Sequence, residues 1–201
     1  MDTHAGTSLA IEVPRLRRPA PRSRIATAEE RARLLAAAPL WFRAFLMLCI
    51  DLALRHGEAA RACAADYDPE RRILTVNRKH DNLSRIPVSE ELHELFLTAM
   101  KRDDARTPLH VVLGGRVTNF NLKDWWYKTK KAANVSDDLR IHDLRRTTAT
   151  ALYLHTKDLR AVQQLLGHRS LHATAGYLAP HDPAELAKML AELRMPTEKT
   201  Q

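Results

Sequence analysis

Apolar positions recur at helical spacing along most of the chain. The segment TAEERARLLAAA opens with Thr27 and Glu30 spaced as a capping box, which predicts a helix that Pro39 ends. The next segment, LWFRAFLMLCIDLAL, is apolar on nearly every side and predicts a buried helix with Arg55 at its C-terminal edge. A second short helix is expected over EAARACAA, residues 58–65, before a break at DYDPE.

In the middle of the chain the pattern changes to a period of two. Apolar and polar residues alternate over residues 73–77, the polar turn HDN follows, and RIPV leads back. This pattern predicts an antiparallel β-hairpin with Lys79 at its tip. Ser89 is expected to cap a helix over EELHELFLTAMKR, and Pro108, Gly114 and Gly115 then mark a loop.

The chain after residue 140 is expected to be helical. Breaks at Lys157, Gly167 and Pro180 separate four helical segments: IHDLRRTTATALYLHT, KDLRAVQQLLG, RSLHATAGYL and DPAELAKMLAELRM. The last helix, over about residues 183–194, is amphipathic and is expected either to fold back on its own domain or to dock on a neighbouring protomer. The fold class that follows is mainly α with a small antiparallel β-sheet, an α+β protein.

Composition narrows the class of protein. With 201 residues, 45% of them hydrophobic, the chain can form one good-sized domain. Its net charge of +8 and pI near 9.8 favour a polyanionic partner, either nucleic acid or an anionic membrane surface. The longest apolar run is interrupted by Arg43 and Asp51, and the start MDTHAG lacks a signal pattern, so a cytoplasmic protein with no membrane span is expected. The cysteines, Cys49 and Cys63, support neither a disulfide framework nor a thiolate metal site.

Residues 1–26 are expected to form a basic arm or linker ahead of the domain. The prolines of PRLRRPAPRSR disfavour a helix and leave an extended segment. The segment fits a solvated tail, a purification remnant or a strand that lies along phosphates. Its arginines are candidate phosphate contacts: Arg15, Arg17, Arg18, Arg22 and Arg24.

Several basic residues could converge on one anion. His142 and Arg145 are three residues apart in IHDLRRTT and share a helix face, although a solvated basic face would give the same pattern. His168 follows Gly167 and is expected at the start of a helix, where anions are favoured. Two further cations are candidates, one at the end of the buried helix and one at the hairpin tip: Arg55 and Lys79.

Other chemistries lack their motifs in this sequence. His168 and His172 are four residues apart, as in a helical zinc pair, but no glutamate follows the first histidine. The sequence contains no G-x-S-x-G elbow and no glycine-rich phosphate loop. We therefore expect neither a metal nor a nucleotide cofactor.

Four segments carry the candidate residues in a specific order: LALRHGEAARACAADYD, RKHDNLSRIPV, HDLRRTTAT and LLGHRSLHATAGY. In the second segment Lys79 lies eight residues before Pro87, and in the last Tyr177 follows His168 by nine. Together the segments resemble the first arginine box, the β-hairpin, the histidine-x-x-arginine box and the leucine-glycine-histidine box of the tyrosine recombinases of the phage-integrase type. The resemblance covers roughly residues 27–195. The matching catalytic positions are Arg55, Lys79, His142, Arg145, His168 and Tyr177, with Glu58 in a supporting place.

The resemblance implies a tyrosine recombinase catalytic-domain fold and a DNA strand transferase that is independent of metal and ATP. Tyr177 would be the nucleophile and would form a 3′-phosphotyrosyl link. Arg55 and Arg145 would stabilise the charge that develops on the phosphate, and Lys79 would protonate the leaving 5′ oxygen. The two histidines would donate hydrogen bonds or handle the tyrosine proton, and the sequence does not assign these roles between them.

The family pattern also sets expectations for domains and partners. Residues 27–201 would be the catalytic domain, and because relatives usually carry a core-binding domain ahead of it, the chain is either truncated or a short stand-alone recombinase. Leu52 and Ala53 stand where the family usually has threonine and glycine. The expected partner is double-stranded DNA, bound by a dimer or tetramer. The C-terminal helix is one candidate contact for this assembly, and the protein would act in the nucleoid of a prokaryote or be encoded by a phage. Expected DNA contacts are the five arm arginines together with Arg78 and Arg85.

A second function remains open from the sequence. The chain could be an accessory protein that keeps the fold and binds DNA without productive chemistry. The presence of Tyr177, Arg55 and Arg145 argues against that alternative, because a protein that only binds DNA has no use for a phenol placed at a phosphate.

Overall fold

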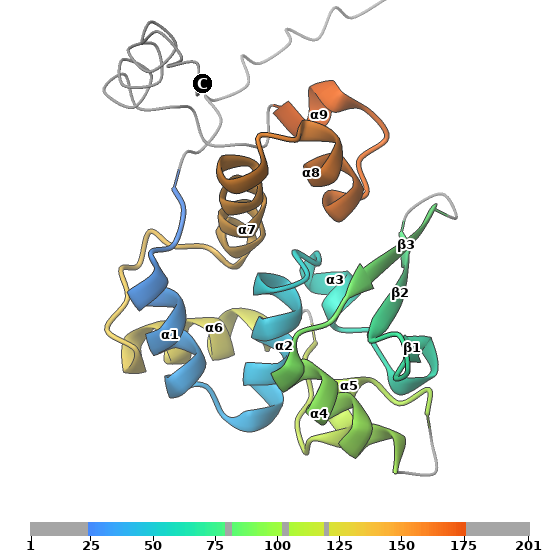
Figure 1. The fold of residues 1–201 in the computed structure, drawn as a ribbon. Helices are drawn as coiled ribbons and strands as arrows, with labels where there is room; N and C mark the ends of the chain where they lie inside the picture. Colours follow the sequence, from blue (N-terminus) through green and yellow to red (C-terminus); the bar gives the residue numbers. More distant parts are fainter. Residues whose placement is uncertain (1–23, 79–81, 102–104, 119–120, 176–201) are drawn as a thin grey trace, which may run out of the picture.

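The computed structural model describes residues 24–78, 82–101, 105–118 and 121–175 (Figure 1). The helices are α1 (Ala28–Ala37), α2 (Leu40–Ile50), α3 (His56–Ala59), the 3-10 helix η1 (Ala64–Asp66), α4 (Glu90–Met100), α5 (Leu109–Val112), α6 (Leu122–Ala132), α7 (Ile141–Thr156), α8 (Leu159–Leu166) and α9 (Leu171–Ala175). The strands are β1 (Tyr67–Asp68), β2 (Ile73–Arg78) and β3 (Asn82–Pro87). The expected class, mainly α with a small antiparallel sheet, is confirmed.

Helix α2 forms the centre of the main core. Eight of its eleven residues are buried, and it packs against α1, α3, α4, α5 and α7. Phe42 stacks on Phe45 with ring centroids 5.6 Å apart, and the Trp125 ring meets Trp41 edge-on at 4.9 Å. A Cβ on Gly115 would lie 1.9 Å from the Trp41 ring, so this position of the α5–α6 loop accepts only glycine without rearrangement. The buried helix predicted from the apolar run is therefore confirmed.

The sheet has the strand order β1-β2-β3, with both pairs antiparallel. In the predicted hairpin Ile73 pairs with Pro87 and Arg78 with Asn82. Leu74, Val76 and Ile86 are buried, so one face of the hairpin packs on the core. Strand β1 and helix α5 were not expected, because the sequence analysis placed a break and a loop there.

Helices α7, α8 and α9 lie together beyond α2, as Figure 1 shows. A second, smaller core joins α7 and α8 to the segment after α2: Ala53, Ala149, Val162 and Leu166. Lys157 (φ 53°) and Gly167 (φ 58°) end α7 and α8 in the left-handed conformation. The breaks expected at these two residues are confirmed.

Three local predictions were wrong. Helix α2 ends at Ile50, and Arg55 lies beyond it as the residue that precedes α3, because the chain turns through a left-handed Ala53. The helix expected over residues 58–65 is replaced by α3 and η1. Ser89 precedes α4, but its hydroxyl donates to Asp51 Oδ2 at 3.2 Å and makes no cap bond.

Some expectations concern residues outside the described part of the chain. They are the arm up to residue 23, the hairpin-tip Lys79, the nucleophile Tyr177 and the helix over about 183–194. Within the described part, none of the helices combines the length and the hydrophobicity that crossing a bilayer requires.

Candidate active site

Arg55 is held by Glu58 at the start of α3. Its backbone N–H donates to Glu58 Oε2 at 2.9 Å, and its Nη1 donates to Glu58 Oε1 at 2.7 Å. The carboxylate thus caps the first turn and orients the guanidinium at the same time. The Arg55 side chain is 39% exposed, whereas that of Glu58 is 6% exposed. Arg55 therefore presents a positioned positive charge at the surface.

Glu58 also neutralises charge inside a cluster that it forms with three arginines, Arg55, Arg78 and Arg145. Its Oε2 lies 3.8 Å from Arg145 Nη1, in a pair that is almost fully buried. Burial by itself would raise the pKa of the Glu58 carboxyl, but the hydrogen bonds from Arg55 and the charges of Arg78 and Arg55 outweigh it and leave that pKa below its ordinary value. Glu58 is therefore a carboxylate at neutral pH.

Arg145 is fixed at the centre of the cluster by backbone carbonyls. The residue is 1% exposed, and its terminal nitrogens donate to Ala53 O and, at 2.7 Å, to Leu166 O. Ala53 belongs to the segment between α2 and α3, and Leu166 is the last residue of α8. One guanidinium from α7 thus ties together two segments that lie far apart in the sequence.

Arg78 does not lie on the surface, where its expected role as a DNA contact would place it. It is 4% exposed, and its terminal nitrogens donate to Leu166 O and, at 2.8 Å, to Leu165 O. Burial lowers the pKa of its guanidinium, while the Glu58 charge opposes that shift. Arg78 is therefore an internal residue of the cluster. The alternation along β2 is a sign of this, because Arg78 lies on the same strand face as the buried Leu74 and Val76.

His168 lies on the turn after α8. The backbone N–H groups of His168 and Gly167 return to the carbonyls of Gln163 and Gln164, which is the Schellman pattern of a helix C-terminus. The expectation that His168 begins a helix was wrong, because α9 starts only at Leu171. Its position follows from the end of α8 rather than from the N-terminus of α9.

The His168 ring is half-buried among positive charges. Burial, followed by the charges of Arg145, Arg55 and Arg78, lowers the pKa of His168 to about 4, and Glu58 only partly offsets them. Its Nδ1 lies 3.2 Å from the hydroxyl of Thr174, which is fully buried in α9. The imidazole is therefore neutral at pH 7.

His142 is in the first turn of α7, one turn before Arg145. Although His142 is exposed, partial desolvation of its ring and then the Arg145 charge lower its pKa, against a smaller opposing effect of Asp143. The structure thus brings together every predicted catalytic residue that it describes: Arg55, His142, Arg145 and His168, with Glu58 between the arginines.

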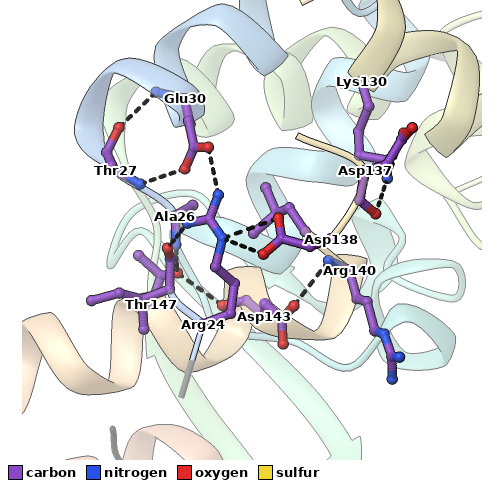
Figure 2. Close-up of polar contacts among 12 residues, drawn as sticks. Arg24, Ala26, Thr27, Glu30, Lys130, Asp137, Asp138, Arg140, Asp143 and Thr147 are labelled. Atoms are coloured by element: carbon purple, nitrogen blue, oxygen red, sulfur yellow. Dashed lines mark hydrogen bonds and ion pairs between the residues drawn. The ribbon is translucent and has the colours of Figure 1, made fainter. Parts of the chain in front are cut away.

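Arg24, another expected DNA contact, is held by two carboxylates (Figure 2). It donates to Glu30 Oε1 at 2.5 Å and to Asp138 at 3.3 Å, and two residues later the Ala26 N–H donates to the Thr147 hydroxyl at 2.8 Å. Arg24 therefore joins α1 to the segment before α7. Arg85 is exposed on β3, in keeping with a surface role, and the other four arm arginines lie outside the described residues.

One group of possible metal ligands occurs among the described residues, on α4. Glu90, His93 and Glu94 on α4 bring one ligand atom each within 4.8 Å of one another. The two carboxylates are exposed, and Nδ1 of His93 is engaged by the Tyr67 hydroxyl. Exposed acidic groups at this helical spacing are common without an ion, so the group does not identify a metal centre.

Residues 23–183, which include the whole cluster, match the family model of the phage integrase family. The chain belongs to the phage integrase family. It is 31% identical over 138 residues to the tyrosine recombinase XerC of Corynebacterium glutamicum, covering 67% of this chain and 45% of the relative. It is 30% identical over 191 residues to the tyrosine recombinase XerD of Xanthomonas campestris pv. campestris, covering 83% and 58%. The chain thus spans about half the length of the curated relatives it matches.

Solved structures share the fold of this integrase-family chain. The crystal structure of the XerA recombinase matches with a TM-score of 0.70 and 22% identity, over 87% of this chain and 66% of that one. The catalytic domain of the bacteriophage HP1 integrase matches with a TM-score of 0.57 and 17% identity, over 90% of this chain and all of that one. The expected tyrosine recombinase catalytic-domain fold is confirmed.

Two features of the site were missed by sequence reasoning. Arg78 and Thr174 both contact the turn that carries His168. Arg78 was expected at the DNA surface, and Thr174 was given no role although it lies in the segment LLGHRSLHATAGY. A signal existed only for Ala53, which occupies the place of the family's usual glycine and has a φ of 50°. A glycine place in a family pattern is itself a sign of left-handed backbone.

Proposed function

We propose that this chain is the catalytic part of a site-specific recombinase that cuts and rejoins DNA through a 3′-phosphotyrosyl intermediate. The observation that carries the proposal is the convergence of Arg55 and Arg145 on Glu58, beside two histidines whose pKa values are lowered. Attack on a phosphodiester adds negative charge to the non-bridging oxygens, and fixed guanidinium groups stabilise that charge.

The two arginines would act differently. Arg55 has an exposed guanidinium at the start of α3 and would bind a non-bridging oxygen directly. Arg145 is buried and held by two carbonyls, so its contribution is a fixed positive potential below the phosphate. Since such groups need no reorganisation during the reaction, they lower the barrier more than mobile charges would.

His168 would accept the proton of the nucleophile. The Thr174 hydroxyl donates its hydrogen to Ser170 O at 3.3 Å. The Thr174 oxygen is then the acceptor for the N–H on Nδ1 of His168. In this tautomer Nε2 carries the acceptor lone pair, and the lowered pKa keeps the ring neutral at pH 7. His142 would then serve as a hydrogen-bond donor to the phosphate.

These groups account for both protons that move during strand cleavage. The phenolic oxygen of Tyr177 attacks phosphorus while its proton passes to His168 Nε2. The bond from phosphorus to the 5′ oxygen breaks, and the Lys79 ammonium gives that oxygen a proton. Rejoining is the reverse sequence with a 5′ hydroxyl as the attacking group.

The wider setting belongs to the same proposal. The partner is double-stranded DNA in the cytoplasm, bound by a dimer or tetramer, with residues 27–201 as the catalytic domain and residues 1–26 as a basic arm. The net charge of +8 supports a polyanionic partner. The contacts of Arg24 with Glu30 and of Ala26 with Thr147 support an arm whose last residues pack on the catalytic domain.

A nicked DNA substrate tests the proposal. The duplex is built from the sequence that the protein selects out of a random duplex pool, with a nick that lets the cleaved end diffuse away. We expect a covalent adduct on a denaturing gel that is lost in Tyr177→Phe and kept in Tyr127→Phe, which alters an exposed tyrosine of α6. Selective DNA binding with no adduct in the unaltered chain would instead favour the accessory protein.

A further inference from the structure

Arg78 is a buried cation whose position is not explained by the chemistry above. It is the last residue of β2 and is 4% exposed, although burying a guanidinium requires compensating partners. Its two terminal nitrogens meet two successive carbonyls, Leu165 O at 2.8 Å and Leu166 O. The same Leu166 carbonyl accepts from Arg145 at 2.7 Å. Two arginines therefore meet at the last residue of α8.

The C-terminus of α8 is suited to such a contact. The last carbonyls of a helix lack intrahelical partners and carry partial negative charge, so a cation placed there stabilises the helix end. The turn also packs closely on the Arg78 side chain, because a Cβ on Gly167 would lie 2.3 Å from Arg78 Cδ. Gly167 also has a φ of 58°, a left-handed conformation that favours glycine.

We propose that Arg78 is a positioning residue, which clamps the end of α8 to β2 and thereby fixes the turn that carries His168. The proposal rests on the proposed function of the site. Gly167 and His168 follow Leu166 directly, so a guanidinium bound to the Leu165 and Leu166 carbonyls restricts the path of the turn. The fork of an arginine suits this task, since two donors in one plane fix direction as well as distance.

The clamp also affects the charge around His168. The charged groups that act on its ring are Arg145, Arg55 and Arg78, which lower its pKa, and Glu58, which raises it. The Thr174 hydroxyl contacts Nδ1. Removing the Arg78 charge should therefore raise the pKa of His168 toward its ordinary value, while a lysine at the same place should leave it low.

Two substitutions separate position from charge. Arg78→Lys keeps the charge and loses the two-pronged grip, and Arg78→Met keeps much of the stem and loses both. In single-turnover reactions on the nicked duplex we expect both variants to form adduct about 100-fold more slowly, the cost typical of a 1 Å misplacement. DNA affinity should stay within about twofold, because a buried side chain makes no phosphate contact. The control is Arg71→Lys, an exposed arginine whose side chain is 75% accessible, and it should react at the unaltered rate.

Histidine NMR titration without DNA gives a second readout. We expect the pKa of His168 to be about 4 in the unaltered chain, to stay low in Arg78→Lys and to rise in Arg78→Met. An Arg78→Lys variant that folds and reacts at the full rate would overturn the proposal, and so would a His168 pKa near 6.5 in the unaltered chain. If the unaltered chain forms no adduct but the titrations follow this pattern, the recombinase function fails and the clamp stands.

Discussion

At the residue scale, the site depends on backbone carbonyls as much as on charged side chains. Ala53 shows why. Its φ of 50° directs its carbonyl to Arg145, while its side chain is fully buried against Val162 and Leu166 in the smaller core. A left-handed conformation costs a residue with a Cβ roughly 1 kcal/mol or more. The segment therefore combines local strain with close packing next to the arginine it holds.

Substitutions at Ala53 should separate these two effects. Ala53→Val adds a β-branched side chain to a left-handed position in a packed core, and we expect it to lower the free energy of unfolding by about 2 kcal/mol or more. Ala53→Gly relieves strain but loses a buried methyl group and gains unfolded-state entropy, so it should change stability by no more than about 1 kcal/mol. Urea denaturation measures both. Equal stability of the valine variant and the unaltered chain would contradict a left-handed Ala53.

The lowered pKa of His168 makes stability depend on pH. In the unfolded chain this imidazole takes up a proton below about pH 6.5, whereas in the folded chain it does so only near 4. The unfolded state thus binds more protons between these values, and the free energy of unfolding should fall as pH drops from 6.5 toward 4. His142 and His110 also have lowered pKa values and act in the same direction.

Denaturation at pH 7 and pH 5 measures this dependence. A His168→Gln variant should lose less stability between the two pH values than the unaltered chain does. The same loss in both proteins would mean that His168 titrates normally in the folded state.

At the element scale, the structure shows how the start of α7 is held. Arg24 bridges Glu30 of α1 and Asp138 ahead of α7, and Ala26 donates to Thr147 within α7 (Figure 2). Since α7 carries His142 and Arg145, the contacts of Arg24 and Ala26 support the helix that supplies two of the four described candidate catalytic residues.

Removing the Arg24 bridge should cost stability and leave phosphate binding alone. We expect Arg24→Gln to lower the free energy of unfolding by about 1 kcal/mol, the upper range for a partly exposed ion pair. The matched control Arg33→Gln, an exposed arginine of α1, should change it by less than about 0.5 kcal/mol. A drop in the salt dependence of DNA binding in Arg24→Gln would show that this arginine contacts phosphate after all.

Elements with a clear period could be predicted from the sequence, and those defined by tertiary contacts could not. The capping box at Thr27, the buried α2 and the β2–β3 hairpin each have a local pattern and are confirmed. Strand β1 has only two residues and forms because Tyr67 pairs with Leu74. So short a strand has no local pattern from which it could be predicted. The alternation of β2 places Arg78 on the buried face, but its partners on α8 could not be predicted, because Leu165 is 87 residues away from it in the chain.

At the scale of the whole molecule, some arginines hold the fold together and others are exposed to solvent. Arg78, Arg145 and Arg24 are bound by carbonyls or carboxylates within the fold, whereas Arg85 is exposed on β3. Some of the 32 lysines and arginines are therefore unavailable to phosphates. Sequence composition predicts the polyanionic partner, but only the fold sorts internal cations from external ones.

Salt titration of DNA binding should distinguish the two groups. Arg85→Gln is expected to reduce the slope of log affinity against log salt by about 1, as loss of one phosphate contact does. The control Arg72→Gln alters an exposed arginine paired with Glu90 and should leave the slope unchanged. An unchanged slope in Arg85→Gln would remove β3 from the proposed DNA surface.

The proposed function depends above all on a covalent link between Tyr177 and DNA. The most direct measurement is mass spectrometry of the protein after reaction with the nicked duplex, nuclease trimming and trypsin digestion. We expect a nucleotide joined through its 3′ phosphate to Tyr177, in the peptide from Ser170 to Lys188. A nucleotide on any other residue, or an unmodified peptide beside a cleaved duplex, would contradict it.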